Sequence, residues 1–211
     1  MPPLATLAGK RVLFAMAADA EYGPHLKAIF TPLMTGVGPV EASIALTRAL
    51  VELKAAGTLP DLVVSLGSAG SRRLKRTEVY QAVSVTYRDM NASAFGFEKG
   101  VTPFLDLPAT QMLPIRIPGV KEATISTGAT IIANSAFDAI AEDMVDMETY
   151  ACLRACQGFG VPLVGLRGIS DGDTDVDHIS HWLEYLHVVD EKLADAVNKL
   201  ETAIADGTIR I

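Results

Sequence analysis

The sequence predicts an α/β fold with three layers, in which helices cover both faces of a mixed, largely parallel central sheet. Apolar runs rich in β-branched residues alternate along the chain with stretches of helical periodicity. No Pro-, Gly- or charge-rich linker divides the 211 residues, of which 49% are hydrophobic and 20% charged. A chain of this length buries roughly 70% of its unfolded surface, so we expect one domain over residues 1–211.

The predicted strands are short apolar runs bounded by turn residues. In chain order they span residues 11–17, 31–36, 61–66, 79–87, 122–126 and 161–169. The third is followed by a small-residue turn over residues 67–70, and the last by a polar cluster over residues 170–177.

Three helices are predicted between and after these strands. Apolar residues recur at helical spacing from Ala42 to Leu53, with Pro39 near the start and Gly57 past the end. Residues 148–159 form the second helix and residues 181–206 the third. Residues 88–120 show no clear period, so we predict a long excursion with an edge strand at residues 113–117.

Composition excludes several classes of partner. The 18 Lys and Arg against 25 Asp and Glu give a net charge of −7, which argues against binding to nucleic acid or an anionic membrane. The longest uncharged stretch, residues 123–137, is too short and too polar to span a bilayer, and the first ten residues contain no signal-like apolar segment. Two cysteines cannot form a disulfide framework, so the sequence predicts a cytoplasmic protein.

Ligands of open α/β sheets bind at the carboxyl ends of strands, so four strand ends are candidate sites. Asp19 and Glu21 follow the first strand, either as a general base or as acids near a helix N-terminus. Small residues at 36–38 and 67–70 let a backbone approach a ligand closely, but neither segment matches a phosphate-binding or dinucleotide-binding loop.

Two further acids are candidates for chemistry. Asp171 directly follows the last buried strand, where partial desolvation raises the pKa of a carboxyl and suits it to proton donation; it is otherwise a cap or turn residue. Glu148 begins a helix, either as its cap or facing the hydroxyls of a ligand.

The acids from 171 to 177 do not form a calcium loop, because Val176 stands where that loop requires Gly. The histidines and cysteines lack metal-type spacing, so no metal is expected.

Four segments together resemble the nucleoside phosphorylase/nucleosidase superfamily, and most of all its 5′-methylthioadenosine/S-adenosylhomocysteine nucleosidases. VDMETYACLRACQGFGVPLVGLRGISDGD, residues 145–173, is similar to the family signature V-E-M-E-A…VP-V-V-R-x-I-S-D, with the same separation of Glu148 and Asp171. AMAADAE (15–21), TGVGPVEAS (35–43) and SLGSAGS (65–71) are similar to three further motifs in the same order. Residues 88–120 match least.

This resemblance implies a nucleoside phosphorylase-like fold and hydrolysis of the N-glycosidic bond of a 5′-substituted adenosine through an oxocarbenium-like transition state, without a cofactor. Asp171 would protonate N7 of the departing adenine and Glu148 would bind the ribose hydroxyls. Asp19 would take the place of the family's water-activating Glu, one methylene shorter, with Glu21 as the alternative. The implied substrate contacts are Met147, Ser68, Ala69, Gly70, Ile131, Ile132 (through its backbone), Ser170 and His181.

The resemblance also implies a structural role for Arg167, in an ion pair with an acid. Ile131 and His181 stand where the family often has aromatic residues, so recognition of the base and of the 5′ substituent is less well defined than the reaction type.

Two other functions stay open. A phosphorylase of the same fold would use phosphate in place of water, but residues 17–24 contain no Arg or Lys, and Arg72 and Arg73 come only after the small-residue turn. A nucleoside-binding protein that has lost catalysis would explain Asp19.

Family members form dimers in which the neighbour closes part of the site. The excursion with Phe95, Phe97 and Phe104 is the expected source of those contacts. The expected partners are therefore a small-molecule nucleoside and a second copy of this chain, and not nucleic acid or a membrane.

Overall fold

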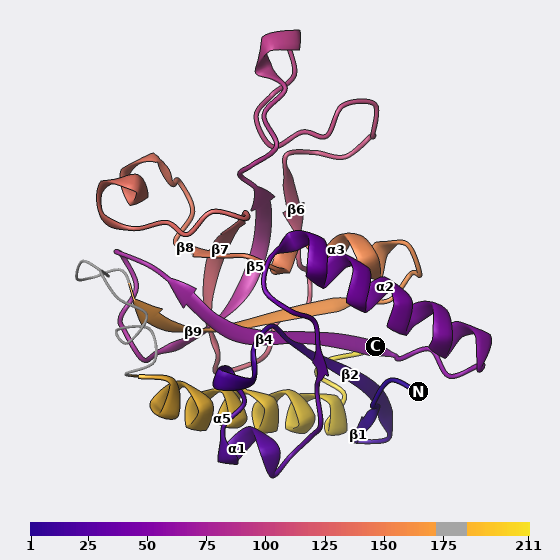
Figure 1. Cartoon of the computed structure of the whole chain (residues 1–211). Coiled ribbons are helices and arrows are strands. Elements are labelled where there is room, and N and C mark those ends of the chain that lie inside the picture. The colour runs from indigo at the N-terminus through magenta and orange to yellow at the C-terminus, as the bar shows by residue number, and fades with distance from the viewer. Residues whose placement is uncertain (172–184) are drawn as a thin grey trace.

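The computed structural model describes residues 1–171 and 185–211. In this part of the chain nine strands form one sheet with helices on both faces (Figure 1). The strands are β1 (Ala5–Leu7), β2 (Lys10–Met16), β3 (Leu33–Met34), β4 (Leu62–Gly70), β5 (Val79–Tyr87), β6 (Thr110–Met112), β7 (Lys121–Thr127), β8 (Met144–Asp146) and β9 (Leu163–Asp171).

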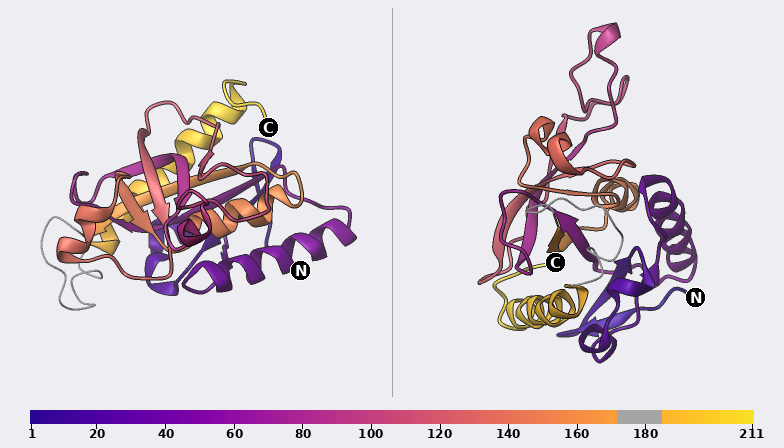
Figure 2. Two further views of the ribbon diagram at one scale, coloured as in Figure 1. Left: turned by 90° about the horizontal axis from the view of Figure 1, so that it is seen from above. Right: turned by 60° about the vertical axis from the view of Figure 1, so that its left-hand side comes forward.

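The helices lie in two layers, one on each face of the sheet. They are α1 (Pro24–Lys27), α2 (Pro39–Ala55), α3 (Thr149–Gln157) and α5 (Leu186–Ala205), with short 3-10 helices η1 (Asp19–Glu21), η2 (Ser93–Phe95) and η3 (Asn134–Ala139). Helices α2 and α3 cover one face, and α1 and α5 cover the other (Figures 1 and 2). The predicted three-layer α/β fold is confirmed. No helix in the described ranges combines the length and apolarity needed to cross a membrane.

Five strands of the sheet pair in a closed ring. β4 is parallel to β9, β9 is antiparallel to β5, β5 is parallel to β7, β7 is parallel to β8, and β8 returns to β4 through Gly70 and Val145. β2 extends the sheet from β4 in parallel, and β1 and β6 pair antiparallel at its edges. The ring gathers segments distant in sequence around one end of β4.

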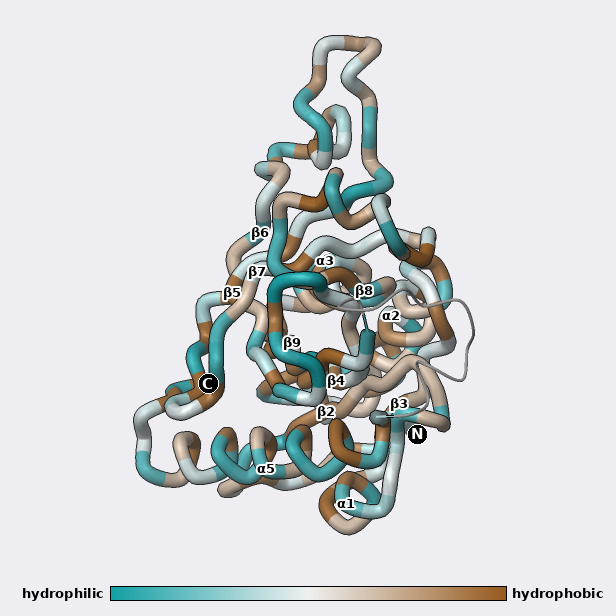
Figure 3. The backbone as a smooth tube through the Cα atoms, turned by 90° about the vertical axis from the view of Figure 1, so that its left-hand side faces the viewer, coloured by the Kyte–Doolittle hydropathy of each residue, from teal (hydrophilic) through white to brown (hydrophobic). Residues whose placement is uncertain are grey.

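Two apolar layers form the core. Most of the predicted stripe of α2, including Leu46, Leu50 and Leu53, is buried against the sheet and α3, and Ala45 is half-buried. On the other face, α5 buries Val189, Leu193, Val197, Leu200 and Ile204 against β2, β4 and β9. Figure 3 shows α5 as alternating brown and teal bands, as expected of a helix with one apolar face. Burial of each such side chain contributes about 1.5–3 kcal/mol.

The structure differs from the sequence prediction at two of the predicted strands and adds elements that were not predicted. Residues 67–70 continue β4 instead of turning, because they pair with β9 from Gly67–Arg167 to Ala69–Ile169. The edge strand of the excursion is Thr110–Met112 and not residues 113–117. Pro114 and Pro118 have no N–H to donate to a ladder, so pairing with β5 ends near Leu113. The strands β1 and β8 and the helix α1 were not predicted.

Candidate active site

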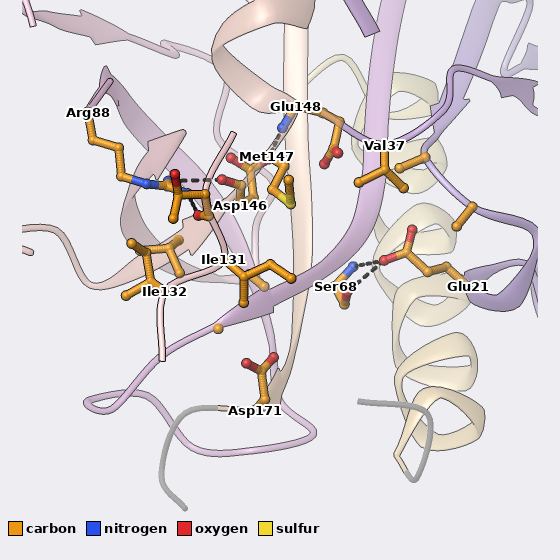
Figure 4. A pocket seen from close by; sticks show the side chains of 16 residues that line it. Glu21, Val37, Ser68, Arg88, Ile131, Ile132, Asp146, Met147, Glu148 and Asp171 are labelled. Atoms are coloured by element: carbon orange, nitrogen blue, oxygen red, sulfur yellow. Dashed lines mark hydrogen bonds between the residues drawn. The ribbon is translucent and has the colours of Figure 1, made fainter. Parts of the chain in front are cut away.

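A cavity of about 480 Å³ opens beyond the ends of β2, β4, β8 and β9 (Figure 4). Most predicted site residues line it: Ser68, Ala69, Gly70, Ile131, Ile132, Met147, Glu148 and Asp171. Ser170 is buried behind the lining, and its hydroxyl donates a hydrogen bond to Oδ1 of Asp171. His181 lies outside the described residues. The sequence therefore locates the cavity, although it places one acid incorrectly.

That acid is Asp19, which is exposed and does not line the cavity, whereas Glu21 does. The chain leaves β2 in the 3-10 turn η1, with Tyr22 N–H donating to the carbonyl of Asp19, and this turn buries the Glu21 side chain. The prediction favoured Asp19 because it keeps the family's spacing from Met16, but the turn after β2 brings Glu21 to the cavity instead. The structure supports the alternative, Glu21.

Glu21 is held by Ser68 at the edge of the cavity. Its Oε1 accepts hydrogen bonds from the backbone N–H of Ser68 at 2.7 Å and from the Ser68 hydroxyl at 2.6 Å. The side chain is 8% exposed, and burial raises the pKa of Glu21 despite these two bonds. Its other oxygen, Oε2, is buried and has no hydrogen-bond partner among residues 1–171 and 185–211.

A second, small cavity lies beside Glu21. It has a volume of about 10 Å³ and polar lining from Glu21, Thr35, Ser65, Glu148 and Arg167. A space of about this size with several polar walls accommodates one water molecule.

Glu148 stands at the start of α3 but does not cap it. Its Oε1 reaches across the cavity edge and accepts a hydrogen bond from the backbone N–H of Gly38 at 2.8 Å. Gly38 has φ +99°, a conformation that favours glycine, and precedes Pro39 at the start of α2. Burial, and then the charge of Asp146, raise the pKa of Glu148 to about 7. The ligand-facing alternative for Glu148 thus agrees with its position.

Asp146 and Arg167 form a buried ion pair behind Glu148. The distance from Asp146 Oδ2 to the Arg167 guanidinium is 2.9 Å, and Asp146 also accepts hydrogen bonds from the hydroxyls of Thr127 and Thr149. Burial favours the neutral acid, but Arg167 and the hydroxyl donors prevail and lower the pKa of Asp146. The expected ion pair of Arg167 is present, and its partner is Asp146.

Asp171 ends β9 directly beside Gly70 of β4. A Cβ placed at Gly70 would lie 3.1 Å from Asp171 Oδ2 and 3.2 Å from the ring of Phe137. The glycine therefore leaves room for the Asp171 carboxyl in the cavity. Figure 4 shows Asp171 at the end opposite Glu148, with Ile131 between them.

Arg88 was not predicted as a site residue, yet it lines the cavity from the end of β5. Its guanidinium donates to the carbonyl oxygens of Ser126, Gly128, Thr130 and Asp146. Four of its five N–H donors are thus used within the protein.

In the described ranges, no group of three or more His, Cys, Asp or Glu side chains is placed to hold a metal ion.

Comparison with known proteins agrees with this geometry. The family model of the phosphorylase superfamily matches residues 30–205. A 5′-methylthioadenosine/S-adenosylhomocysteine nucleosidase of Haemophilus ducreyi is 30% identical over 185 residues, which cover 78% of this chain and 76% of that protein. This chain belongs to the 5′-methylthioadenosine/S-adenosylhomocysteine nucleosidase family of the phosphorylase superfamily.

A further curated relative and two solved structures are also similar to this chain. The nucleosidase of Haemophilus influenzae is 35% identical over 161 residues, which span 66% of this chain and 66%, just under two thirds, of that relative. A mutant nucleosidase of Helicobacter pylori with 5′-methylthioadenosine in its active site has a TM-score of 0.77 at 19% identity, covering 92% of this chain and 99% of its own. The futalosine hydrolase of Helicobacter pylori has a TM-score of 0.74 at 19% identity, covering 90% and 96%. These structures share the fold.

Proposed function

We propose that this protein hydrolyses the N-glycosidic bond of 5′-substituted adenine nucleosides such as 5′-methylthioadenosine and S-adenosylhomocysteine, releasing adenine and the 5′-substituted ribose. The observation that carries the proposal is the convergence of Glu21, Glu148 and Asp171 on one cavity. Departure of a purine requires a proton donor near the purine, a polar group that binds the sugar and a general base that activates water. The three carboxyls occupy separate walls of the cavity (Figure 4).

Asp171 acts at the leaving group. In its protonated form it donates to N7 of adenine while the bond between N9 and C1′ breaks and its electron pair moves into the purine. The Ser170 hydroxyl orients this carboxyl through its hydrogen bond to Oδ1. Gly70 leaves the space in which the carboxyl meets the base.

Glu148 and Met147 hold the sugar. The ionised Glu148 carboxylate accepts hydrogen bonds from the ribose hydroxyls, and the bond from Gly38 leaves one oxygen available in the cavity. Met147 packs against the ribose, and Ser68, Ala69 and Gly70 line its opposite side.

Glu21 activates the attacking water. Its Oε2, which has no hydrogen-bond partner in the described part of the chain, accepts one proton as the water oxygen bonds to C1′, so the hydroxyl remains on the sugar. A carboxylate whose pKa is raised by burial is a stronger base than one in water. The small polar cavity beside Glu21 offers a place for such a water.

Phosphate is a poorer nucleophile for this cavity than water. Arg88 is the one Lys or Arg of the described residues that lines it, and its guanidinium is committed to four carbonyls. Arg72 and Arg73 instead contact residues 138–142. A carboxylate at Glu21 would repel an anion at the same position.

The working unit that we propose is a cytoplasmic homodimer. An exposed apolar stripe runs along α2 from the cavity wall at Val37 through Val40, Ile44 and Val51, each at least 50% exposed. Residues 88–109 form an arm that projects from the sheet between β5 and β6 (Figure 1) and carries the exposed Phe95 and Phe104. Exposed apolar groups of this kind are typical of protein interfaces.

Adenine release from 5′-methylthioadenosine in phosphate-free buffer tests the proposed reaction. We expect rapid release that added phosphate does not accelerate, and a loss of about 10²-fold or more in Asp171→Asn. Release only in the presence of phosphate would show a phosphorylase, and adenine binding without release would show a binding protein.

A further inference from the structure

We propose that Arg88, assisted by Asp89, is a positioning residue that sets the base selectivity of the cavity by holding the backbone of residues 128–132. The inference rests on the proposed function and on the contact with the purine that the family resemblance implies for Ile131 and Ile132, which both line the cavity. It concerns a residue that is not expected to touch the reacting atoms.

The arginine joins two stretches of backbone that are separate in sequence, residues 126–130 and the end of β8 at Asp146. One terminal nitrogen donates to the carbonyls of Ser126 at the end of β7 and Asp146 at the end of β8, the latter at 2.9 Å. The other donates to Gly128 at 3.0 Å and Thr130 at 2.7 Å, in the segment after β7. A planar guanidinium fixes these carbonyls relative to one another, which a flexible ammonium does not do.

Asp89 and Gly128 complete the clamp. Asp89 Oδ2 accepts a hydrogen bond from the backbone N–H of Ala129. A Cβ at Gly128 would lie 2.4 Å from Asp89 Oδ1 and 2.7 Å from Arg88 Cγ and Nε. The segment therefore passes so close to both side chains that only glycine fits at this position.

The clamp matters for recognition because the exposed residues 129–131 are held little by side-chain packing. Residues 128–133 lie outside helices and strands, and Ile131 is 77% exposed, so side-chain packing does not fix it. The backbone of Ile132 comes two residues after Thr130, the last carbonyl that Arg88 holds. A displacement of about 1 Å at such a wall changes binding and selectivity strongly.

Arg73 provides a matched control. It also holds a loop through carbonyl oxygens, donating to Ala141 at 2.6 Å and Ile140 at 3.1 Å, but it does not line the cavity. Replacing Arg73 removes guanidinium–carbonyl hydrogen bonds of the same kind from residues 140–141, which do not form the purine wall.

The experiment compares Arg88→Met, Arg88→Lys and Arg73→Met with the wild type. For each protein, kcat and KM are measured for 5′-methylthioadenosine and for the corresponding hypoxanthine nucleoside, adenine affinity by calorimetry, and Tm. We expect Arg88→Met to raise KM and weaken adenine binding about tenfold, with kcat within about threefold, and to reduce the preference for the adenine nucleoside. Arg88→Lys should be intermediate, and Arg73→Met should change Tm only.

Three results would overturn the inference. The first is a KM and a selectivity of Arg88→Met equal to those of the wild type. The second is a loss in Arg88→Met that is confined to kcat. The third is a change of KM and selectivity in Arg73→Met as large as that in Arg88→Met. If the wild type neither binds adenine nor releases it, the proposed function is wrong and this inference falls with it. An active wild type with an unaffected Arg88→Met contradicts the inference alone.

Discussion

Glu21, Asp146 and Glu148 show how surroundings divide roles among similar side chains. Asp146 faces Arg167 and two threonine hydroxyls, which lower its pKa, so it stays ionised as part of the framework. Glu21 is buried and Glu148 half-buried, neither has a cation at hydrogen-bond distance among the described residues, and desolvation raises the pKa of both. Titratable groups with pKa values moved apart in one site are typical of acid–base catalysis.

Replacing Glu21 with Gln tests which acid activates water. Gln keeps an oxygen for Ser68 but cannot accept the proton, so we expect kcat to fall about 10²-fold or more in Glu21→Gln. Asp19→Asn is the matched control and should stay within about threefold, because Asp19 is exposed outside the cavity. Single-turnover adenine release measures both. A larger loss in Asp19→Asn would return the role to Asp19.

Ionisation of Glu148 should make both the activity and the stability of the protein depend on pH. Its pKa of about 7 means that the carboxylate needed for the ribose is lost below neutral pH, so kcat/KM should fall as the pH drops from 8 to 6. The folded pKa lies above the unfolded value of 4.5, so the stability contribution of Glu148 is full below 4.5 and is lost as pH rises through 7.

Glu148→Gln should therefore raise the free energy of unfolding at pH 8, by about 1–3 kcal/mol, while abolishing most activity. Gln retains the acceptor for Gly38 N–H. Urea unfolding at pH 5 and pH 8 measures the difference. A variant that loses stability equally at both pH values would show that the charge of Glu148 is not the cause.

At the scale of elements, a carboxylate on α5 holds the start of α1, just after Glu21. Asp190 is 1% exposed and accepts hydrogen bonds from the backbone N–H of His25 at 2.8 Å and of Leu26 at 3.1 Å. A Cβ at Gly23 would lie 2.4 Å from Asp190 Cγ, so a larger residue there would displace the carboxylate that holds α1.

Asp190→Ala should lower the free energy of unfolding by about 1–3 kcal/mol, because the buried N–H of Leu26 and the part-buried N–H of His25 lose their acceptor. Asp195→Ala on the same helix is the control. Its side chain is 64% exposed and pairs with Lys199 at 2.7 Å, so its loss should change stability by less than about 1 kcal/mol. Urea denaturation of both variants checks the contrast, and equal effects would contradict it.

At the scale of the whole molecule, the apolar stripe of α2 predicts association. We expect light scattering to report a dimer for the wild type and a monomer with reduced activity for Ile44→Asp, because a charge cannot be buried in an apolar interface without a partner. Lys199→Asp adds a carboxylate to α5 in the opposite layer and should stay dimeric. A fully active wild-type monomer would contradict the dimer.

Long periodic elements were predictable from sequence, whereas short ones were not. The buried stripes of α2 and α5 and the apolar run of β9 have local patterns that agree with the final structure. β8 has three residues and α1 has four, so neither has enough residues to show a period. These short elements exist because the closed ring and the contacts with α5 hold them.

The sequence by itself determined the α/β class, the family and the order of the motifs that form the cavity, because these depend on residue identity and local periodicity. Only the tertiary structure decided that Glu21 and not Asp19 faces the cavity, that Asp146 pairs with Arg167, and that Arg88 reaches the segment after β7. Each of these depends on the direction of a side chain after a turn or across strands distant in sequence. No local pattern encodes that direction.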